Sequence, residues 1–139
     1  MSFKFLEHTA DIKIFVEEKS LDKAFITSAM ALKEVIVDKI KVKAKIKKEI
    51  KVKGKDRESL LYNFLEEFLY LVDAKSLILS EINELKITKT KNKLSLHAKI
   101  VGDNSLNYKF TNEVKAVTYN DMLIKESKNK TTIQFVLDV

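Results

Sequence analysis

The N-terminal segment FLEHTADI crowds four potential metal ligands into five residues before an apolar stretch: Glu7, His8, Thr9 and Asp11. Carboxylate, hydroxyl and imidazole groups hold metal ions in proteins, so this segment is a candidate cation site. Glu7 and His8 can equally be turn residues, with Asp11 a surface aspartate, and the residues alone leave both interpretations open. A cation site would need a second carboxylate from a distant part of the chain.

Asp138 is the natural source of that second carboxylate. The segments DIKIFVEE and TTIQFVLDV both alternate between apolar and polar residues, which is typical of half-buried strands. The alternation predicts that Asp11 and Asp138 face away from the core. If the two strands are neighbours, the aspartates would repel each other unless a cation or a lysine neutralised them. The α-carboxylate of Val139 is expected beside Asp138.

Composition excludes several other kinds of site. Two glycines, Gly54 and Gly102, cannot form a phosphate-cradling glycine loop, and the absence of cysteine excludes disulfides, thiolate metal sites and cysteine nucleophiles. The chain has two histidines, His8 and His97, which leaves little scope for a zinc site of nitrogen ligands. Any metal ion is therefore expected to be a hard cation held by oxygen.

The length of 139 residues predicts a single domain over residues 1–139. Hydrophobic residues make up 45% of the chain and charged residues 33%, which favours a globular protein over a disordered one. No run approaches the roughly 18 apolar residues that span a bilayer, and the N-terminus lacks the layout of a signal peptide. We therefore expect a cytoplasmic protein with no membrane partner.

The formal net charge of +6 raises the question of nucleic-acid binding, and many lysines lie in one segment, KIKVKAKIKKEIKVKGK. Here lysines alternate with apolar residues, which predicts a half-buried strand with a solvated lysine stripe. The residues expected to face the core are Ile40, Val42, Ala44, Ile46, Ile50 and Val52. No aromatic residues interleave with the lysines to stack bases, so a solvated strand is favoured over an RNA-binding stripe.

Two helices are predicted. Ser20 is a suitable N-cap for an amphipathic helix that runs to about Val37, and Asp56 can cap a second helix with a broad apolar face between Leu60 and Val72. Gly54 breaks the strand pattern before the second helix.

The remainder of the chain is predicted to be mostly strands. A hairpin is expected over residues 77–102, with His97 on its solvated face, and extended segments are expected at residues 108–119, 121–127 and 131–139. Together the elements indicate an α+β (α/β) fold. The predicted architecture is a two-layer sandwich: a mixed, mostly antiparallel sheet with two helices packed on one face.

Four segments occur together in this chain: FLEHTADI near the start, ESLLYNFLEEFLYLVD, EVKAVTYNDM and the terminal LDV. In this order and spacing they resemble the archease family, and the resemblance covers essentially the whole chain. Archeases are small cytoplasmic proteins that activate the RtcB-type RNA ligase. That ligase joins RNA ends bearing a 3′-phosphate or 2′,3′-cyclic phosphate to 5′-hydroxyl ends, as in tRNA splicing and RNA repair. The resemblance implies a non-enzymatic protein cofactor that promotes guanylylation of the ligase by GTP and its multiple turnover.

The resemblance also implies a site. Archeases carry a divalent cation at one tip, Ca²⁺ in the first instance with Mg²⁺ or Mn²⁺ as alternatives, and the matching ligands are Asp11, Asp138 and Val139. His8 and Lys115 would lie beside these ligands or face the partner, although His8 can also form a turn and Lys115 can be a solvated strand lysine. The chain departs from the family at Asn120, where members commonly have histidine.

Two other functions stay open at this stage. The lysine stripe could make the chain an RNA-binding module, or the chain could act as a chaperone or specificity modulator of an RNA methyltransferase. In the leading interpretation the direct partner is the RtcB-type ligase. RNA is then reached indirectly through the ligase, and neither DNA nor a membrane is involved.

Overall fold

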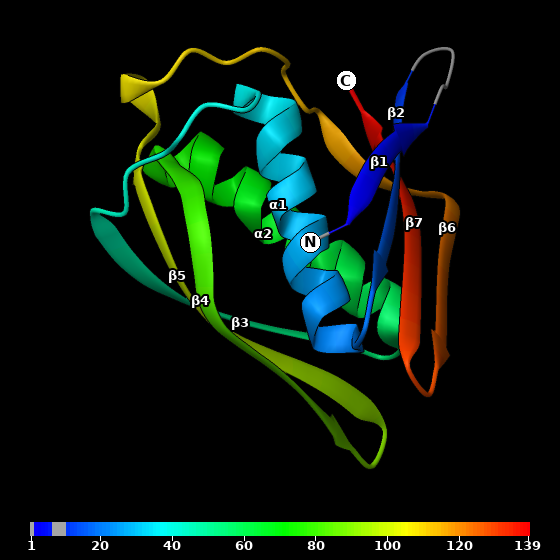
Figure 1. Cartoon of the computed structure of the whole chain (residues 1–139). Coiled ribbons are helices and arrows are strands. Elements are labelled where there is room, and N and C mark those ends of the chain that lie inside the picture. Colours follow the sequence, from blue (N-terminus) through cyan, green and yellow to red (C-terminus); the bar gives the residue numbers. More distant parts are fainter. Residues whose placement is uncertain (1, 7–10) are drawn as a thin grey trace.

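The computed structural model describes residues 2–6 and 11–139, in which seven strands form two antiparallel sheets with two helices between them (Figure 1). The first sheet has the order β1 (Phe3–Leu6), β2 (Asp11–Glu18), β7 (Lys130–Asp138), β6 (Ala116–Ser127). The second sheet has the order β3 (Ile46–Gly54), β5 (Lys93–Asn104), β4 (Leu77–Thr90). The helices are α1 (Leu21–Val37) and α2 (Arg57–Lys75), and a short 3-10 turn, η1 (Ser105–Asn107), follows β5.

The predicted α+β class, with two helices and antiparallel strands, is confirmed. The expectation of one sheet is wrong, because the strands divide into two sheets that cover opposite sides of the helix pair. Helix α1 packs against β2 and β4, while α2 packs against β3 and β6, so each helix contacts both sheets. Alternation shows which side of a strand is buried, but it does not reveal the partner with which that strand pairs. No helix among the described residues is long and apolar enough to cross a membrane.

Both helices begin where the sequence predicts. The Ser20 hydroxyl accepts a hydrogen bond from the Lys23 backbone N–H at 3.2 Å, which satisfies one of the free donors at the start of α1. At α2 the Asp56 carboxylate accepts from the Ser59 N–H at 2.7 Å, and the Ser59 hydroxyl accepts from the Asp56 N–H at 3.2 Å. This reciprocal pair is a capping box, and it stops the β3 chain from continuing as a strand.

Gly54, at the end of β3, is required by the close approach of α2. A Cβ atom at this position would lie 2.5 Å from the Leu60 backbone nitrogen, too near for any side chain. The glycine that interrupts the strand pattern therefore also allows the helix to pack directly against the strand end.

The core lies between the two sheets and surrounds the helices. Strands β2 and β7 contribute side chains that are fully shielded from solvent, and so do both helices: Ile14, Val16, Phe25, Leu60, Leu61, Phe64, Leu65, Ile133, Phe135 and Leu137. The rings of Phe25 in α1 and Phe64 in α2 lie 5.9 Å apart, which joins the helices at the centre of this core. The predicted inward faces of the first and last long strands are thus confirmed.

The lysine-rich segment forms a strand only in its second half. Residues 39–45 lie before β3, and the side chains of Ile40 and Ile46 are 41% and 43% exposed, so their predicted burial is wrong. Ala44 is exposed as well, whereas Val42 and Ile50 are buried as predicted. Before Lys45, whose N–H donates to the Gly102 carbonyl of β5 at 2.9 Å, two side chains bond to this part of the backbone. The Lys43 N–H donates to the Tyr108 hydroxyl at 2.9 Å, and the Val42 carbonyl accepts from the Ser80 hydroxyl at 2.7 Å.

An irregular segment, residues 105–115, carries the chain from the second sheet to the start of β6. The extended conformation predicted from residue 108 therefore begins as a strand only at Ala116. Tyr108 fixes the beginning of the segment, because its hydroxyl donates to the buried Asp103 carboxylate at 2.7 Å while accepting from Lys43. Further along, the Thr111 N–H donates to the Ile36 carbonyl of α1 at 2.7 Å. These bonds determine where β6 enters the first sheet.

We expect Tyr108→Phe to lower the thermal stability of the protein at neutral pH, because it removes the hydrogen-bond partner of a buried carboxylate. The Tyr108 hydroxyl is the largest cause that holds the pKa of Asp103 below its ordinary value of 3.8. The stabilisation is therefore present at neutral pH and is lost as pH falls through the lowered pKa. Thermal unfolding of the two proteins should differ more at about pH 7 than at about pH 2.

Tyr70→Phe is the matched control, since Tyr70 is 51% exposed and makes no hydrogen bond among the described residues. It should melt like the wild type at both pH values. A Tyr108→Phe protein with an unchanged melting temperature at neutral pH would contradict the anchoring role.

Candidate functional site

Strand pairing brings together the two aspartates that the sequence singled out. Asp11 is the first residue of β2 and Asp138 is the last residue of β7, and the antiparallel register makes them direct cross-strand partners. The chain end lies beside the start of β2 and the start of β6 in Figure 1. We call this end of the first sheet, with Asp11, Asp138 and Val139, the tip.

Both aspartates lie on the face of the sheet that points away from the helices. Two pairs of even-numbered β2 residues with their β7 partners, Ile14 with Phe135 and Val16 with Ile133, are fully buried in the core. Side chains alternate along a strand, so the face of Asp11 and Asp138 is the opposite one. Both residues are half-buried, which leaves their carboxylates accessible at the edge of the molecule.

Val139 and Lys115 lie on either side of Asp138 in the structure. Val139 follows Asp138 directly, and its half-buried side chain packs against the core. The Lys115 backbone N–H donates to the Asp138 carbonyl at 2.7 Å, which fixes this exposed lysine beside the tip on the neighbouring chain segment. This backbone hydrogen bond holds Asp138 in place and does not involve the lysine side chain.

A third carboxylate near the tip was not anticipated from the sequence. The β6 register jumps between Thr118 and Leu123, and within this irregularity Asp121 adopts a left-handed backbone with φ of 55°. The Lys13 amine lies 3.3 Å from the Asp121 carboxylate, and the Gln134 amide donates to the Asp121 carbonyl at 2.9 Å. Asp121 therefore lies over the same sheet face as the aspartate pair. Its sequence signal is the Asn-Asp dipeptide within the strand, since both residues tolerate positive φ.

Lys13 is the cation closest along β2 to the aspartate pair. It lies two residues after Asp11 on the same face, and its side chain is only 21% exposed. Because its amine is paired with Asp121, the lysine is directed along the sheet toward β6. Val136, its cross-strand partner on β7, is fully buried although alternation places it on this outward face.

His8 and the rest of the HTAD motif up to Ala10 lie outside the described residues. Within the described part of the chain, no group of three or more His, Cys, Asp or Glu side chains is arranged to hold a metal ion. The site formed by the described residues is thus an open pair of carboxylates at a sheet end. An ion held there would have coordination positions left for water or for a partner.

The donor set at the tip fits a hard divalent cation. Its side-chain donors are carboxylate oxygens, which Ca²⁺, Mg²⁺ and Mn²⁺ prefer over the softer ligands that zinc and copper select. Like charges directly opposite each other on a sheet are destabilising, and a bound cation would remove that cost. Two side-chain carboxylates do not fill the six to eight oxygen positions that Ca²⁺ takes, so water, the Val139 carboxylate or another molecule would supply the rest.

Comparison with known proteins gives a consistent picture. The model of the archease protein family matches residues 3–139 of this chain. An archease from Pyrococcus abyssi is 45% identical over 122 residues, which cover 86% of this chain and 85% of that protein. An archease from Sulfolobus acidocaldarius is 34% identical over 139 residues, covering 99% and 98% of the two chains.

Solved structures have the same architecture. The solution structure of Methanobacterium thermoautotrophicum protein 1598 superposes with a TM-score of 0.84 at 29% identity, covering 99% of this chain and 98% of that one. The crystal structure of a Thermotoga maritima archease, described as a possible chaperone, gives a TM-score of 0.61 at 19% identity, with coverage of 98% and 96%. At that identity the second likeness concerns the fold alone.

We expect Ca²⁺ to raise the melting temperature of the protein, because an ion that binds the folded pair stabilises it. The gain is about 2.7 kcal/mol at a free ion concentration of 100 times the dissociation constant. Asp138→Asn should abolish most of this response, because it removes one of the two paired carboxylates that would bind the ion.

Asp73→Asn, an exposed aspartate of α2 far from the tip, makes the same change of charge and should keep the full response to Ca²⁺. An Asp138→Asn protein that Ca²⁺ stabilises as much as the wild type would contradict the assignment of the ion to the tip.

Proposed function

Because the chain belongs to the archease family, we propose that it is a protein cofactor of an RtcB-type RNA ligase rather than an enzyme. In this role it promotes guanylylation of the ligase by GTP and sustains multiple turnover. The ligase itself joins RNA ends bearing a 3′-phosphate or 2′,3′-cyclic phosphate to 5′-hydroxyl ends. The process served is tRNA splicing and RNA repair.

The observation that carries the proposal is the direct cross-strand pairing of Asp11 with Asp138 at one end of the first sheet. These residues come from opposite ends of the chain, and both belong to segments that resemble the family's ligand motifs. A pair of carboxylates at an exposed sheet end can enter the active site of another protein. A pair enclosed within a cavity could not make that contact.

In the proposed role, Asp11, Asp138 and Val139 would hold the divalent cation. When bound, the ion would supply positive charge that neutralises the carboxylates and attracts phosphate oxygens of a partner's nucleotide. Ca²⁺ is the first choice by family resemblance, with Mg²⁺ and Mn²⁺ as alternatives for the same oxygen ligands.

The chain's own contribution is to present these oxygens in a fixed arrangement. Each aspartate belongs to a strand whose other face is locked into the core, so neither backbone needs to move when a partner arrives. Asp121 pairs with Lys13, which keeps this lysine amine engaged beside the tip. Pre-organisation of this kind reduces the entropic cost of forming the complex.

The partner in this proposal is the ligase, and RNA is reached through it. The role places the chain in the cytoplasm, where the ligase acts, and it calls for no contact with a membrane or with DNA.

We expect Asp11→Ala and Asp138→Ala each to abolish stimulation of ligase guanylylation, because each removes half of the carboxylate pair. The assay follows transfer of radiolabelled GMP from GTP to the ligase, with and without the chain, and then the number of ligation turnovers. Asp73→Ala should stimulate like the wild type.

Circular dichroism and melting curves must first show that the variants are folded. With folded variants, full stimulation by both Asp11→Ala and Asp138→Ala would refute the role of the tip. Failure of the wild type to stimulate the ligase would refute the proposed function as a whole.

A further inference from the structure

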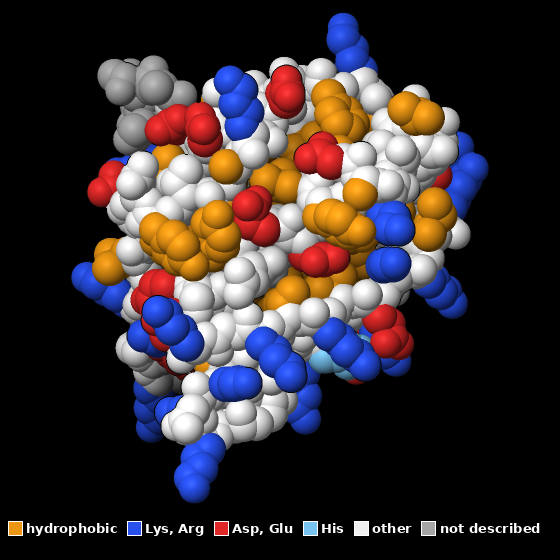
Figure 2. Space-filling view, turned by 180° about the vertical axis from the view of Figure 1, so that it is seen from behind, with side chains coloured by type: hydrophobic (Ala, Val, Ile, Leu, Met, Phe, Trp, Pro, Cys, Tyr) orange, Lys and Arg blue, Asp and Glu red, His pale blue; other side chains and the backbone are white. Residues whose placement is uncertain are grey.

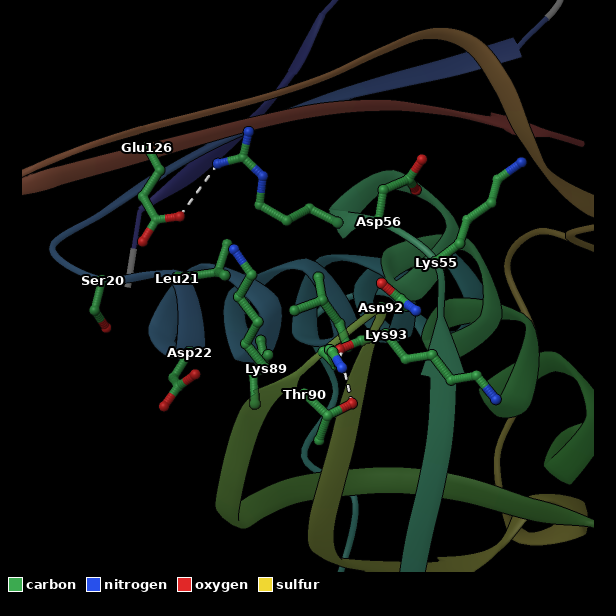
Figure 3. A pocket seen from close by; sticks show the side chains of 14 residues that line it. Ser20, Leu21, Asp22, Lys55, Asp56, Lys89, Thr90, Asn92, Lys93 and Glu126 are labelled. Atoms are coloured by element: carbon green, nitrogen blue, oxygen red, sulfur yellow. Dashed lines mark hydrogen bonds and ion pairs between the residues drawn. The ribbon is translucent and has the colours of Figure 1, made fainter.

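A basic groove lies at the end of the molecule opposite the tip. It is a cavity of about 770 Å³ formed where four segments meet: the start of α1, the turn between β3 and α2, the β4–β5 hairpin and the end of β6 (Figure 3). Strand β2 separates the two ends, since Asp11 begins it and the groove residue Ser20 follows shortly after its last residue. Eight strand residues extend about 26 Å, so the groove and the tip are independent surfaces.

The groove has an excess of unpaired positive charge. Five cationic side chains line it, against three carboxylates: Lys55, Arg57, Lys89, Lys91 and Lys93 against Asp22, Asp56 and Glu126. Two of the carboxylates are already engaged, because Glu126 pairs with Arg57 at 3.1 Å and Asp56 caps α2. The four lysines form no salt bridge among the described residues of the chain.

The remaining carboxylate, Asp22, is not an exposed counter-charge for these lysines. It is half-buried at the start of α1, and this burial is the largest cause that raises its pKa. Thr90 closes the β4–β5 hairpin by donating to the Lys93 carbonyl at 3.3 Å. Three of the four lysines, Lys89, Lys91 and Lys93, are thus presented from the end of this hairpin.

Figure 2 shows how the charge is distributed on one face of the molecule. Lysine and arginine side chains gather toward the lower end of this view, where the β4–β5 hairpin turns. Acidic and hydrophobic side chains cover the central part of the same face. The uneven distribution gives a polyanion a preferred end at which to approach.

The lining residues determine which polyanion fits. No aromatic side chain is present among them, so bases would find no stacking surface and contacts would be made to phosphates. Both adjacent helix starts are capped by their own side chains, so the lysines and not the helix ends would hold the phosphates. The lysines line a concave site, and a positively charged groove can follow the backbone of a flexible single strand.

We propose that the basic groove binds the phosphodiester backbone of single-stranded RNA without sequence preference. The choice of RNA as the strand rests on the proposed function, while the preference for a phosphodiester chain rests on the lysines and the shape of the groove. One chain would then engage the ligase with its tip and hold a stretch of the substrate RNA at its other end.

The test measures binding of a fluorescent oligouridylate of about a dozen nucleotides by anisotropy over a series of salt concentrations. The triple variant Lys89→Gln, Lys91→Gln, Lys93→Gln should bind about tenfold more weakly at moderate salt. The slope of log K against log salt should become shallower by about two, because three fewer counterions are displaced.

The matched control is Lys41→Gln, Lys43→Gln, Lys45→Gln, which removes the same charge from exposed positions before β3. Its salt slope should stay near that of the wild type. If both triple variants weaken RNA binding equally, the attraction is diffuse and the proposed RNA site in the groove is refuted. An unchanged RNA affinity of the groove variant would refute it as well. A polyglutamate peptide that displaces the RNA as effectively as unlabelled oligouridylate would identify an acidic-peptide site and also overturn the proposal.

Guanylylation assays on the same proteins separate this inference from the proposed function. If the chain stimulates the ligase but RNA binding does not depend on the groove lysines, the RNA-site proposal is refuted and the proposed function stands. Groove-dependent RNA binding by a wild-type chain that does not stimulate the ligase would support the groove and refute the proposed function.

Discussion

The antiparallel pairing of β2 with β7 is the constraint on which the rest of the molecule depends. It joins the start of the chain to its end, and its buried residues, including Ile14 opposite Phe135, form one wall of the core. A slip of one residue would turn this apolar wall toward solvent and bury the polar face, so packing specifies the register strongly. The same register sets Asp11 opposite Asp138. The hydrophobic core therefore maintains a pair of like charges that would not approach each other on a flexible chain.

This arrangement holds a pair of carboxylates in a defined position at an exposed end of the sheet. The backbone of Asp138 is held on both sides, by β2 through the ladder and by Lys115 through a 2.7 Å hydrogen bond. The segment that delivers Lys115 is itself fixed by Tyr108 and by the end of α1. Core packing and the surrounding hydrogen bonds thus fix the backbone that carries these carboxylates. In the proposed role, a partner can bind the carboxylates without first ordering this part of the chain.

The tip and the basic groove differ in charge and in construction. The tip uses carboxylates on adjacent strands, whose separation is set by the ladder. The groove uses lysines from the β3–α2 turn and the β4–β5 hairpin, and their side chains are long and flexible. A rigid acidic pair suits a small ion with defined coordination, while flexible ammonium groups suit a chain of phosphates with variable positions. The length of β2 keeps the opposite charges apart.

The sequence by itself determined the helix starts at Leu21 and Arg57, the inward faces of β2 and β7, and the outward direction of Asp11 and Asp138. These features depend on neighbours only a few residues away, through capping and alternation. Tertiary structure decided the division into two sheets, the late start of β3, the position of Asp121 beside Lys13 and the gathering of lysines around the groove. Each of these depends on contacts between residues far apart in the chain, whose pairing no local pattern encodes.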